Sequence, residues 1–68
     1  MTDTKKRRDD PRVARTRARA LEATLELAAE FGLHACTFDA VSERSGIARS
    51  TLYRHWTNQS ELVMDALE

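Results

Sequence analysis

The side chains best suited to binding chemistry lie in residues 44–60, a stretch that carries three arginines and no acidic residue. Helical spacing places Leu52 and Trp56 on one side of a short helix, so the polar residues around them face outward. The outward side chains, with Thr51 and His55 beside them, are Arg49, Ser50, Tyr53 and Arg54. Arginine can hold a guanine edge or a phosphate through two parallel hydrogen bonds, and hydroxyl groups donate to phosphate. This face therefore predicts an interface for double-stranded DNA.

A second short helix and a tight turn must hold that face in place. Thr37 is a good N-cap for a helix of about two turns with Val41 on its apolar side. Ser45-Gly46-Ile47 then forms the turn, because glycine accepts a positive φ without a clash at Cβ and Ile47 supplies an apolar anchor. A third helix follows from about Ala48 to His55. The sequence thus predicts a helix-turn-helix over residues 37–56.

A long first helix precedes this motif. Asp10 and Pro11 suit its N-cap and first position, and a start one turn later, near Arg15, also fits. No Gly or Pro interrupts the pattern before Gly32, which is typical of the position after a helix C-terminus. Helical spacing predicts a buried stripe of Ala14, Ala18, Leu21, Leu25, Ala28 and Phe31.

A fourth helix is predicted after residues 57–60, which are cap and turn formers. Thr57 or Asn58 is its expected N-cap. Its predicted apolar face is Leu62, Val63, Ala66 and Leu67. The alternation typical of strands is absent from the sequence. The predicted fold is all-α, a small helical bundle over residues 11–68 with a homeodomain-like three-helix core and the start of a fourth helix.

The formal net charge of the 68 residues is zero, but the charges are unevenly distributed. Residues 1–20 hold eight basic and three acidic side chains, whereas residues 21–68 hold three basic and eight acidic ones. Clustering of one sign, more than total charge, indicates a nucleic-acid partner. Residues 1–10 are predicted to form a disordered basic arm, and the predicted phosphate or minor-groove contacts are Lys6, Arg7, Arg8 and Arg12. A solvated tail without a partner fits the same composition.

Several other classes of protein are disfavoured. The sequence has no phosphate-binding glycine loop, no paired carboxylates expected to converge on a pocket and no nucleophile with a positioned base, so we expect no catalytic residues. Two histidines and one cysteine, Cys36, are too scattered for a metal site, and no cofactor is expected. The longest apolar run has three residues, far short of a membrane span, and no apolar stretch follows the basic start as in a signal peptide. A single thiol fits the reducing cytoplasm.

Several short motifs occur together in one order. They are Gly32-Leu33, Cys36-Thr37-Phe38-Asp39-Ala40-Val41-Ser42, Ser45-Gly46-Ile47, Ser50-Thr51-Leu52-Tyr53-Arg54-His55-Trp56 and Glu61-Leu62. Their combination is specific, and it closely resembles the N-terminal DNA-binding domain of the TetR family of bacterial transcriptional regulators. The resemblance covers roughly Arg15 to Leu67, nearly all of the chain outside the arm.

The resemblance implies a role for each matching position. Thr37 matches a threonine that meets a phosphate at the start of the second helix. Tyr53 and His55 match residues that grip phosphates beside the major groove. The positions that face the groove itself are Arg49, Ser50, Thr51 and Arg54.

The chain departs from the family pattern in the predicted first helix, where Ala28 stands in place of a bulky aromatic residue, and at four positions in or beside the helix-turn-helix. Gln59 stands where a lysine usually touches phosphate, which implies a weaker contact at this position. Ala48 replaces a serine that often caps the recognition helix. Ser42 replaces a small apolar alanine, and its hydroxyl is expected to donate to a carbonyl one turn earlier. Trp56 replaces the usual phenylalanine as a larger plug in the core.

The resemblance also implies partners that one DNA-binding domain cannot bind by itself. It implies a homodimer on a palindromic operator, in most members a repressor, acting in the bacterial cytoplasm at the nucleoid. A small-molecule inducer would bind a larger C-terminal domain that lies outside this chain, and the 68-residue chain alone is expected to be monomeric. A helical module that binds a protein through Glu22, Glu26 and Glu30 remains an alternative, although it leaves residues 44–60 without a purpose.

Overall fold

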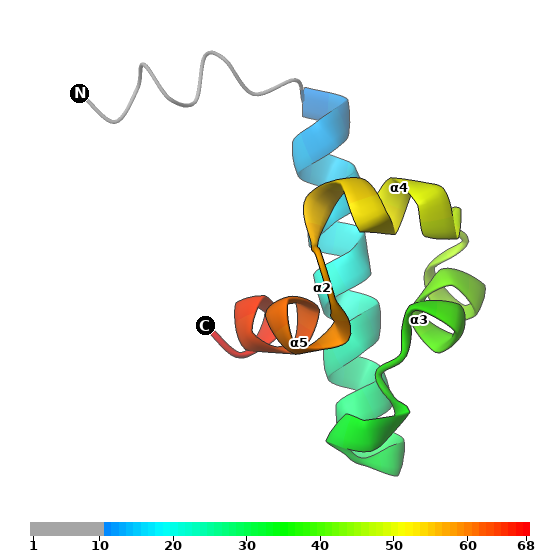
Figure 1. The fold of residues 1–68 in the computed structure, drawn as a ribbon, viewed down its shortest axis with the longest axis vertical. Helices are drawn as coiled ribbons and strands as arrows, with labels where there is room; N and C mark the ends of the chain where they lie inside the picture. Colours follow the sequence, from blue (N-terminus) through cyan, green and yellow to red (C-terminus); the bar gives the residue numbers. More distant parts are fainter. Residues whose placement is uncertain (1–10) are drawn as a thin grey trace.

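The computed structural model describes residues 11–68, which form four α-helices and one 3₁₀ turn (Figure 1). The elements are α2 (Pro11–Phe31), η1 (Leu33–Ala35), α3 (Phe38–Ser45), α4 (Arg49–His55) and α5 (Gln59–Leu67). No strand occurs in this described range, so the all-α prediction is confirmed. The predicted arm, the Asp10 cap and the side chains of Lys6, Arg7 and Arg8 lie outside it.

Helix α2 is the long element on which the others pack. It begins at Pro11, which is the earlier of the two predicted starts. It ends before Gly32, which has a φ of 96°. The Gly32 N–H donates to the Ala28 carbonyl at 2.9 Å. The chain then tightens into η1, where the N–H of Cys36 donates to Leu33 O at 3.1 Å. No pattern in the sequence predicted this short turn.

The buried face of α2 differs from the predicted stripe. Its buried residues are Ala20, Ala23, Thr24 and Leu27. Of the predicted stripe, Leu21 and Ala28 are half-buried, whereas the exposed members are Ala14, Ala18, Leu25 and Phe31. Alanine and leucine occur on several faces of this helix, so periodicity alone could not select one. Packing selected the face with small side chains, where α3 and α5 lie against α2.

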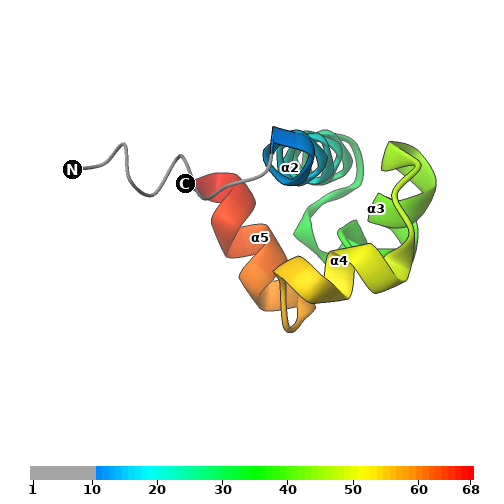
Figure 2. The same ribbon diagram turned by 90° about the horizontal axis from the view of Figure 1, so that it is seen from above.

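The core lies between α2 and the three shorter helices, which surround it when the molecule is viewed from above (Figure 2). Its members are Ala20, Ala23, Leu27, Cys36, Phe38, Val41, Ile47, Leu52, Trp56 and Leu62. Cys36 is fully buried, and burial raises the pKa of its thiol. Its Sγ lies 3.4 Å from the Thr24 carbonyl, to which it donates. Cys36 is therefore a packing residue.

Helix α5 begins with a side-chain cap. Asn58 is the N-cap, its Oδ1 accepting from the Glu61 N–H at 2.9 Å, and Glu61 Oε1 accepts from the Thr57 N–H at 3.0 Å. Of the predicted apolar face, Leu62 is fully buried, but Leu67 is 59% exposed. None of the helices in residues 11–68 is long and apolar enough to span a membrane.

Candidate nucleic-acid interface

The turn between α3 and α4 fixes how the two helices meet. Gly46 has a φ of 79°, as the predicted turn requires, and its N–H donates to Ser42 O at 2.9 Å. Ser45 Oγ donates to Val41 O at 2.6 Å and accepts from the Ile47 N–H at 3.2 Å. The Ser42 prediction is wrong, because its hydroxyl donates to Ile47 O at 2.6 Å instead of one turn back. The turn brings that carbonyl back over α3, within reach of the serine.

The start of α3 matches the prediction for Thr37. Its backbone is extended, and its Oγ1 accepts from the Ala40 N–H at 3.1 Å, which is N-cap geometry. Helix α4 has no such cap, because the side chain of Ala48 forms no hydrogen bond there. Helix α4 therefore starts without the side-chain cap that a serine at this position could supply.

One face of α4 is buried and the other is open to solvent. Leu52 is fully buried, and Ile47 before the helix is 7% exposed. The outward side chains are Arg49, Ser50, Tyr53 and Arg54, all exposed, while Thr51 and His55 are half-buried at the flank. The seven residues of α4 include no acid. The predicted orientation of this helix is thus confirmed.

Two depressions border α4. Together they are lined by every predicted DNA-binding residue in the described range except one. The first, of about 430 Å³, brings together Thr37, Arg49, Tyr53 and Gln59 from α4 and both its neighbours in sequence. The Tyr53 ring stands edge-on to Phe38, with centroids 4.4 Å apart and planes at 72°. This contact holds the phenol ring at the edge of the core while 57% of the residue stays exposed.

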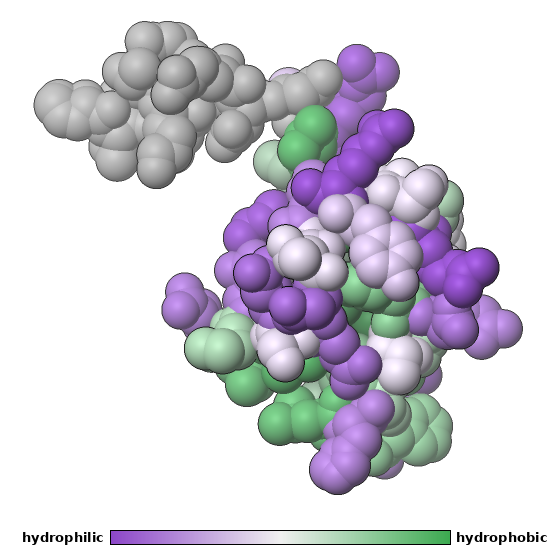
Figure 3. Space-filling view, viewed as in Figure 1, coloured by the Kyte–Doolittle hydropathy of each residue, from purple (hydrophilic) through white to green (hydrophobic). Residues whose placement is uncertain are grey.

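The second depression, of about 390 Å³, lies between α4 and the first turns of α2. Its polar and basic lining includes Arg12, Thr16, Thr51, Arg54 and His55. Arg12 therefore belongs to α2, not to the arm with which it was grouped in the sequence. Hydrophilic side chains gather over the upper part of the molecule, where α4 and the first turns of α2 lie (Figure 3). Ser50, the remaining predicted residue, lies on the exposed face of α4.

Arg49 has an acidic neighbour, Asp39, that residue spacing did not predict. Its Nη1 lies 2.6 Å from Asp39 Oδ1 in the first turn of α3, and the two side chains are 60% and 75% exposed. The two residues are ten positions apart, so only the crossing of α3 and α4 brings them together. The acid-free face of α4 thus has one carboxylate at its edge.

The acidic row on α2 is engaged within the molecule. Arg44 of α3 lies 3.0 and 3.1 Å from the two carboxylate oxygens of Glu30 and 3.4 Å from Glu26. The hydrogen bond from Arg44 lowers the pKa of Glu30, and the same bond raises the pKa of Arg44. Two of the three carboxylates proposed for a protein partner therefore already have a partner. This weakens the interaction-module alternative.

Residues 11–68 contain no group of three side chains suited to hold a metal ion. What they offer is a solvent-facing helix with arginine, hydroxyl and imidazole groups, which lies between two depressions whose linings include polar and basic side chains. Such an arrangement can form hydrogen bonds to base edges and to phosphates along a groove.

Comparisons with known proteins agree with this geometry. A family model described as "Bacterial regulatory proteins, tetR family" matches residues 20–66. The HTH-type transcriptional repressor KstR of Rhodococcus jostii is 43% identical over 51 residues, which cover 75% of this chain and 24% of that protein. KstR of Mycolicibacterium smegmatis is 41% identical over 51 residues, covering 75% of this chain and 25% of that protein.

A further relative is YdeS of Bacillus subtilis, named an uncharacterized HTH-type transcriptional regulator, which is 33% identical over 60 residues. That match covers 88% of this chain and 30% of YdeS, so the chain spans less than a third of the length of each of these relatives. No solved structure matches the chain significantly. The family match covers the helix-turn-helix, the second half of α2 and nearly all of α5, and the chain belongs to the TetR family of DNA-binding bacterial transcriptional regulators.

Proposed function

We propose that α4 is the recognition helix and that it lies in the major groove of duplex DNA. The observation that carries this proposal is the exposed, acid-free face of α4 between two depressions whose linings include polar and basic side chains. The major groove is about 12 Å wide and admits an α-helix. In this arrangement the groups that face the base edges and the groove walls are Arg49, Ser50, Thr51 and Arg54.

Phosphate contacts would flank the groove on both sides. Thr37, Tyr53 and Gln59 border the first depression and would meet one strand. His55 and Arg12 border the second depression and would meet the other. Gln59 is uncharged, so it forms a weaker hydrogen bond to phosphate than the charge-assisted bond of a lysine.

The action of the whole protein is proposed from its relatives. The KstR proteins are named repressors, and the relatives extend well beyond the matched stretch. We infer a sequence-specific repressor that acts in the bacterial cytoplasm as a homodimer on a palindromic operator. Release by a small molecule bound to a separate C-terminal domain completes the proposal. A single DNA-binding domain contacts only one half-site of the operator, so its Kd for DNA should be near the non-specific range of about 10⁻⁴ to 10⁻⁶ M.

The test needs no knowledge of the operator. A labelled 68-residue chain is titrated with short random-sequence duplex DNA at low salt and followed by NMR. Chemical-shift changes are expected at Thr37 and in residues 48–55, and added salt should reverse them. Changes confined to the first residues of the chain would contradict the placement of α4 in the groove.

A matched pair of variants separates this surface from general charge. Arg54→Ala and Arg44→Ala remove the same charge, but Arg44 faces Glu30 and Glu26 on α2. Loss of a phosphate or base contact at Arg54 should weaken binding roughly tenfold, whereas Arg44→Ala should change the Kd little. Equal losses of DNA affinity in both variants would mean that the affinity depends only on the net charge of the protein.

A further inference from the structure

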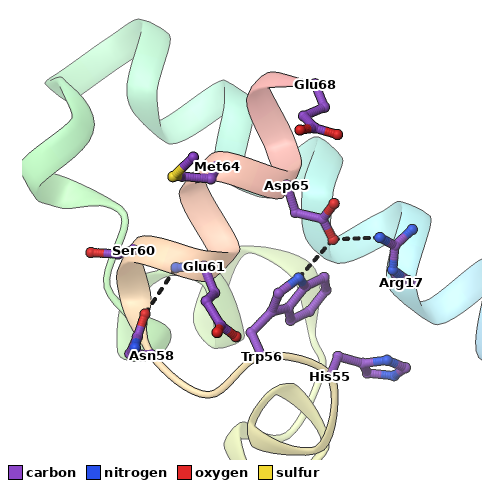
Figure 4. Close-up of a pocket in the computed structure, with 9 residues that line it drawn as sticks. All are labelled: Arg17, His55, Trp56, Asn58, Ser60, Glu61, Met64, Asp65 and Glu68. Atoms are coloured by element: carbon purple, nitrogen blue, oxygen red, sulfur yellow. Dashed lines mark hydrogen bonds and ion pairs between the residues drawn. The ribbon is translucent and has the colours of Figure 1, made fainter.

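One carboxylate ties three helical elements together at the end of α4. Asp65 of α5 accepts a hydrogen bond from Trp56 Nε1 at 2.8 Å and forms an ion pair with Arg17 of α2 (Figure 4). The Arg17 guanidinium carbon also lies 6.0 Å from the centre of the Trp56 ring, within the range of a cation–π contact. Arg17, Trp56 and Asp65 line one depression of about 550 Å³.

Trp56 is the residue through which this cluster reaches the recognition helix. It directly follows α4, and its backbone N–H closes the last turn by donating to Leu52 O at 2.9 Å. Its side chain is 4% exposed and belongs to the core. The rings of His55 and Trp56 lie 5.2 Å apart. The indole is therefore connected to the last turn of α4 through the Trp56 backbone and through the His55 ring.

The indole N–H needs an acceptor because it is almost buried. A buried donor without a partner is costly, and Asp65 supplies the partner from the neighbouring helix. A phenylalanine at this position would fill the core without offering an N–H. The bond thus depends on two residues, Trp56 and Asp65, neither of which belongs to α4 itself.

We propose that Asp65 is a positioning residue for DNA binding. It fixes the last turn of α4 through the Trp56 indole N–H, and it holds α5 to α2 through Arg17. This inference rests on the proposed function of α4. The residues whose placement it would control are those of the last turn, Tyr53, Arg54 and His55.

The sign of the effect separates positioning from electrostatics. Asp65 is acidic, so its removal reduces repulsion of phosphate and, on charge alone, should tighten DNA binding. Positioning gives the opposite result, because a loosened last turn loses phosphate contacts. Each lost phosphate contact should also make the dependence of log Kd on log salt shallower by about one.

The experiment compares four single variants of the 68-residue chain on a labelled random-sequence duplex at low salt. Asp65→Leu and Trp56→Phe remove the indole bond, and each should weaken binding roughly three- to tenfold. Asp65→Asn keeps an acceptor for the indole and should retain most of the affinity. Glu68→Gln removes one negative charge beside the same depression and should leave binding unchanged or slightly tighter.

A double variant and a spectroscopic signal complete the test. If Asp65 acts through the indole, Asp65→Leu combined with Trp56→Phe binds no more weakly than the weaker of the two single variants. The chain has one tryptophan, so its indole N–H gives a single NMR resonance. That resonance should shift strongly in Asp65→Leu and little in Asp65→Asn. Circular dichroism establishes that each variant is folded at the temperature of measurement.

The outcomes divide cleanly. Folded Asp65→Leu that binds as tightly as Glu68→Gln would overturn the positioning role, as would additive losses in the double variant. If Asp65→Leu does not fold, the test rests on Trp56→Phe, which keeps an aromatic ring in the core. Unchanged DNA binding by Trp56→Phe would then refute the inference. Failure of the unmodified chain to bind DNA would overturn the proposed function itself, a result distinct from normal binding by the variants.

Discussion

With α4 in the major groove as proposed, the ion pair between Asp39 and Arg49 should make DNA binding sensitive to an acidic residue outside α4. The Asp39 carboxylate lies 2.6 Å from the guanidinium of Arg49 in the unbound protein. Arg49 must leave this partner, or share it, to contact DNA. We therefore expect Asp39→Asn to tighten binding to random-sequence duplex DNA.

The size of the effect follows from the exposure of the pair. The two side chains are 60% and 75% exposed, so solvent screens their attraction. Exposed ion pairs contribute about 0.2 to 1 kcal/mol. Freeing Arg49 from this pair should lower the Kd by a factor of roughly 1.4 to 5. Removal of a negative charge near phosphates adds to the gain, and this part falls as salt is raised.

A double-mutant cycle measures the part that passes through Arg49. The Kd is determined by fluorescence polarisation for the unmodified chain, Asp39→Asn, Arg49→Ala and the double variant at one low salt concentration. The gain from Asp39→Asn should shrink when Arg49 is absent. Glu43→Gln is the control, because Glu43 is an exposed acid of the same helix.

Two results would refute this reasoning. An equal gain with and without Arg49 would show that Asp39 acts only by repelling phosphate. A loss of affinity in Asp39→Asn would show that the carboxylate orients Arg49 toward DNA instead of competing for it.

Three further predictions concern stability. Gly46→Ala should lower the free energy of unfolding by about 1 to 2 kcal/mol, because φ is 79° at this residue. The loss comes from the backbone alone, since nothing lies within 4 Å of the added Cβ. Urea denaturation that shows no loss of stability would contradict the strain at this turn. Leu52→Ala should cost about 2 to 5 kcal/mol, since Leu52 is fully buried, and an unchanged Tm by circular dichroism would contradict that packing. Arg44 lowers the pKa of Glu30 below the model-compound value of 4.5, so this pair stabilises the fold above that pH and ceases to do so as the pH falls through the folded-state value. The Tm advantage of the unmodified chain over Glu30→Gln should therefore shrink on acidification, and a constant difference between about pH 6 and about pH 3 would rule out the linkage.

The sequence alone determined the elements that depend on near neighbours. Thr37 and Asn58 cap their helices through side-chain bonds to an N–H three residues on, and Gly32 and Gly46 supply the positive φ that ends α2 and α3. These features need only a few consecutive residues, so their residue types reveal them. The outward face of α4 followed in the same way, because Leu52 could point only toward the core.

The tertiary structure decided every feature that joins distant residues. It selected the buried face of α2, where Ala20 and Ala23 are packed and Leu25 is left 44% exposed. It also formed the pairs Asp39–Arg49, Glu30–Arg44 and Trp56–Asp65, whose members belong to different elements. Such contacts depend on the angles and distances at which helices cross, and those are set by the fit of many side chains at once. Helical spacing orders the residues of one helix around its axis, but it carries no information on which face a neighbouring helix will cover.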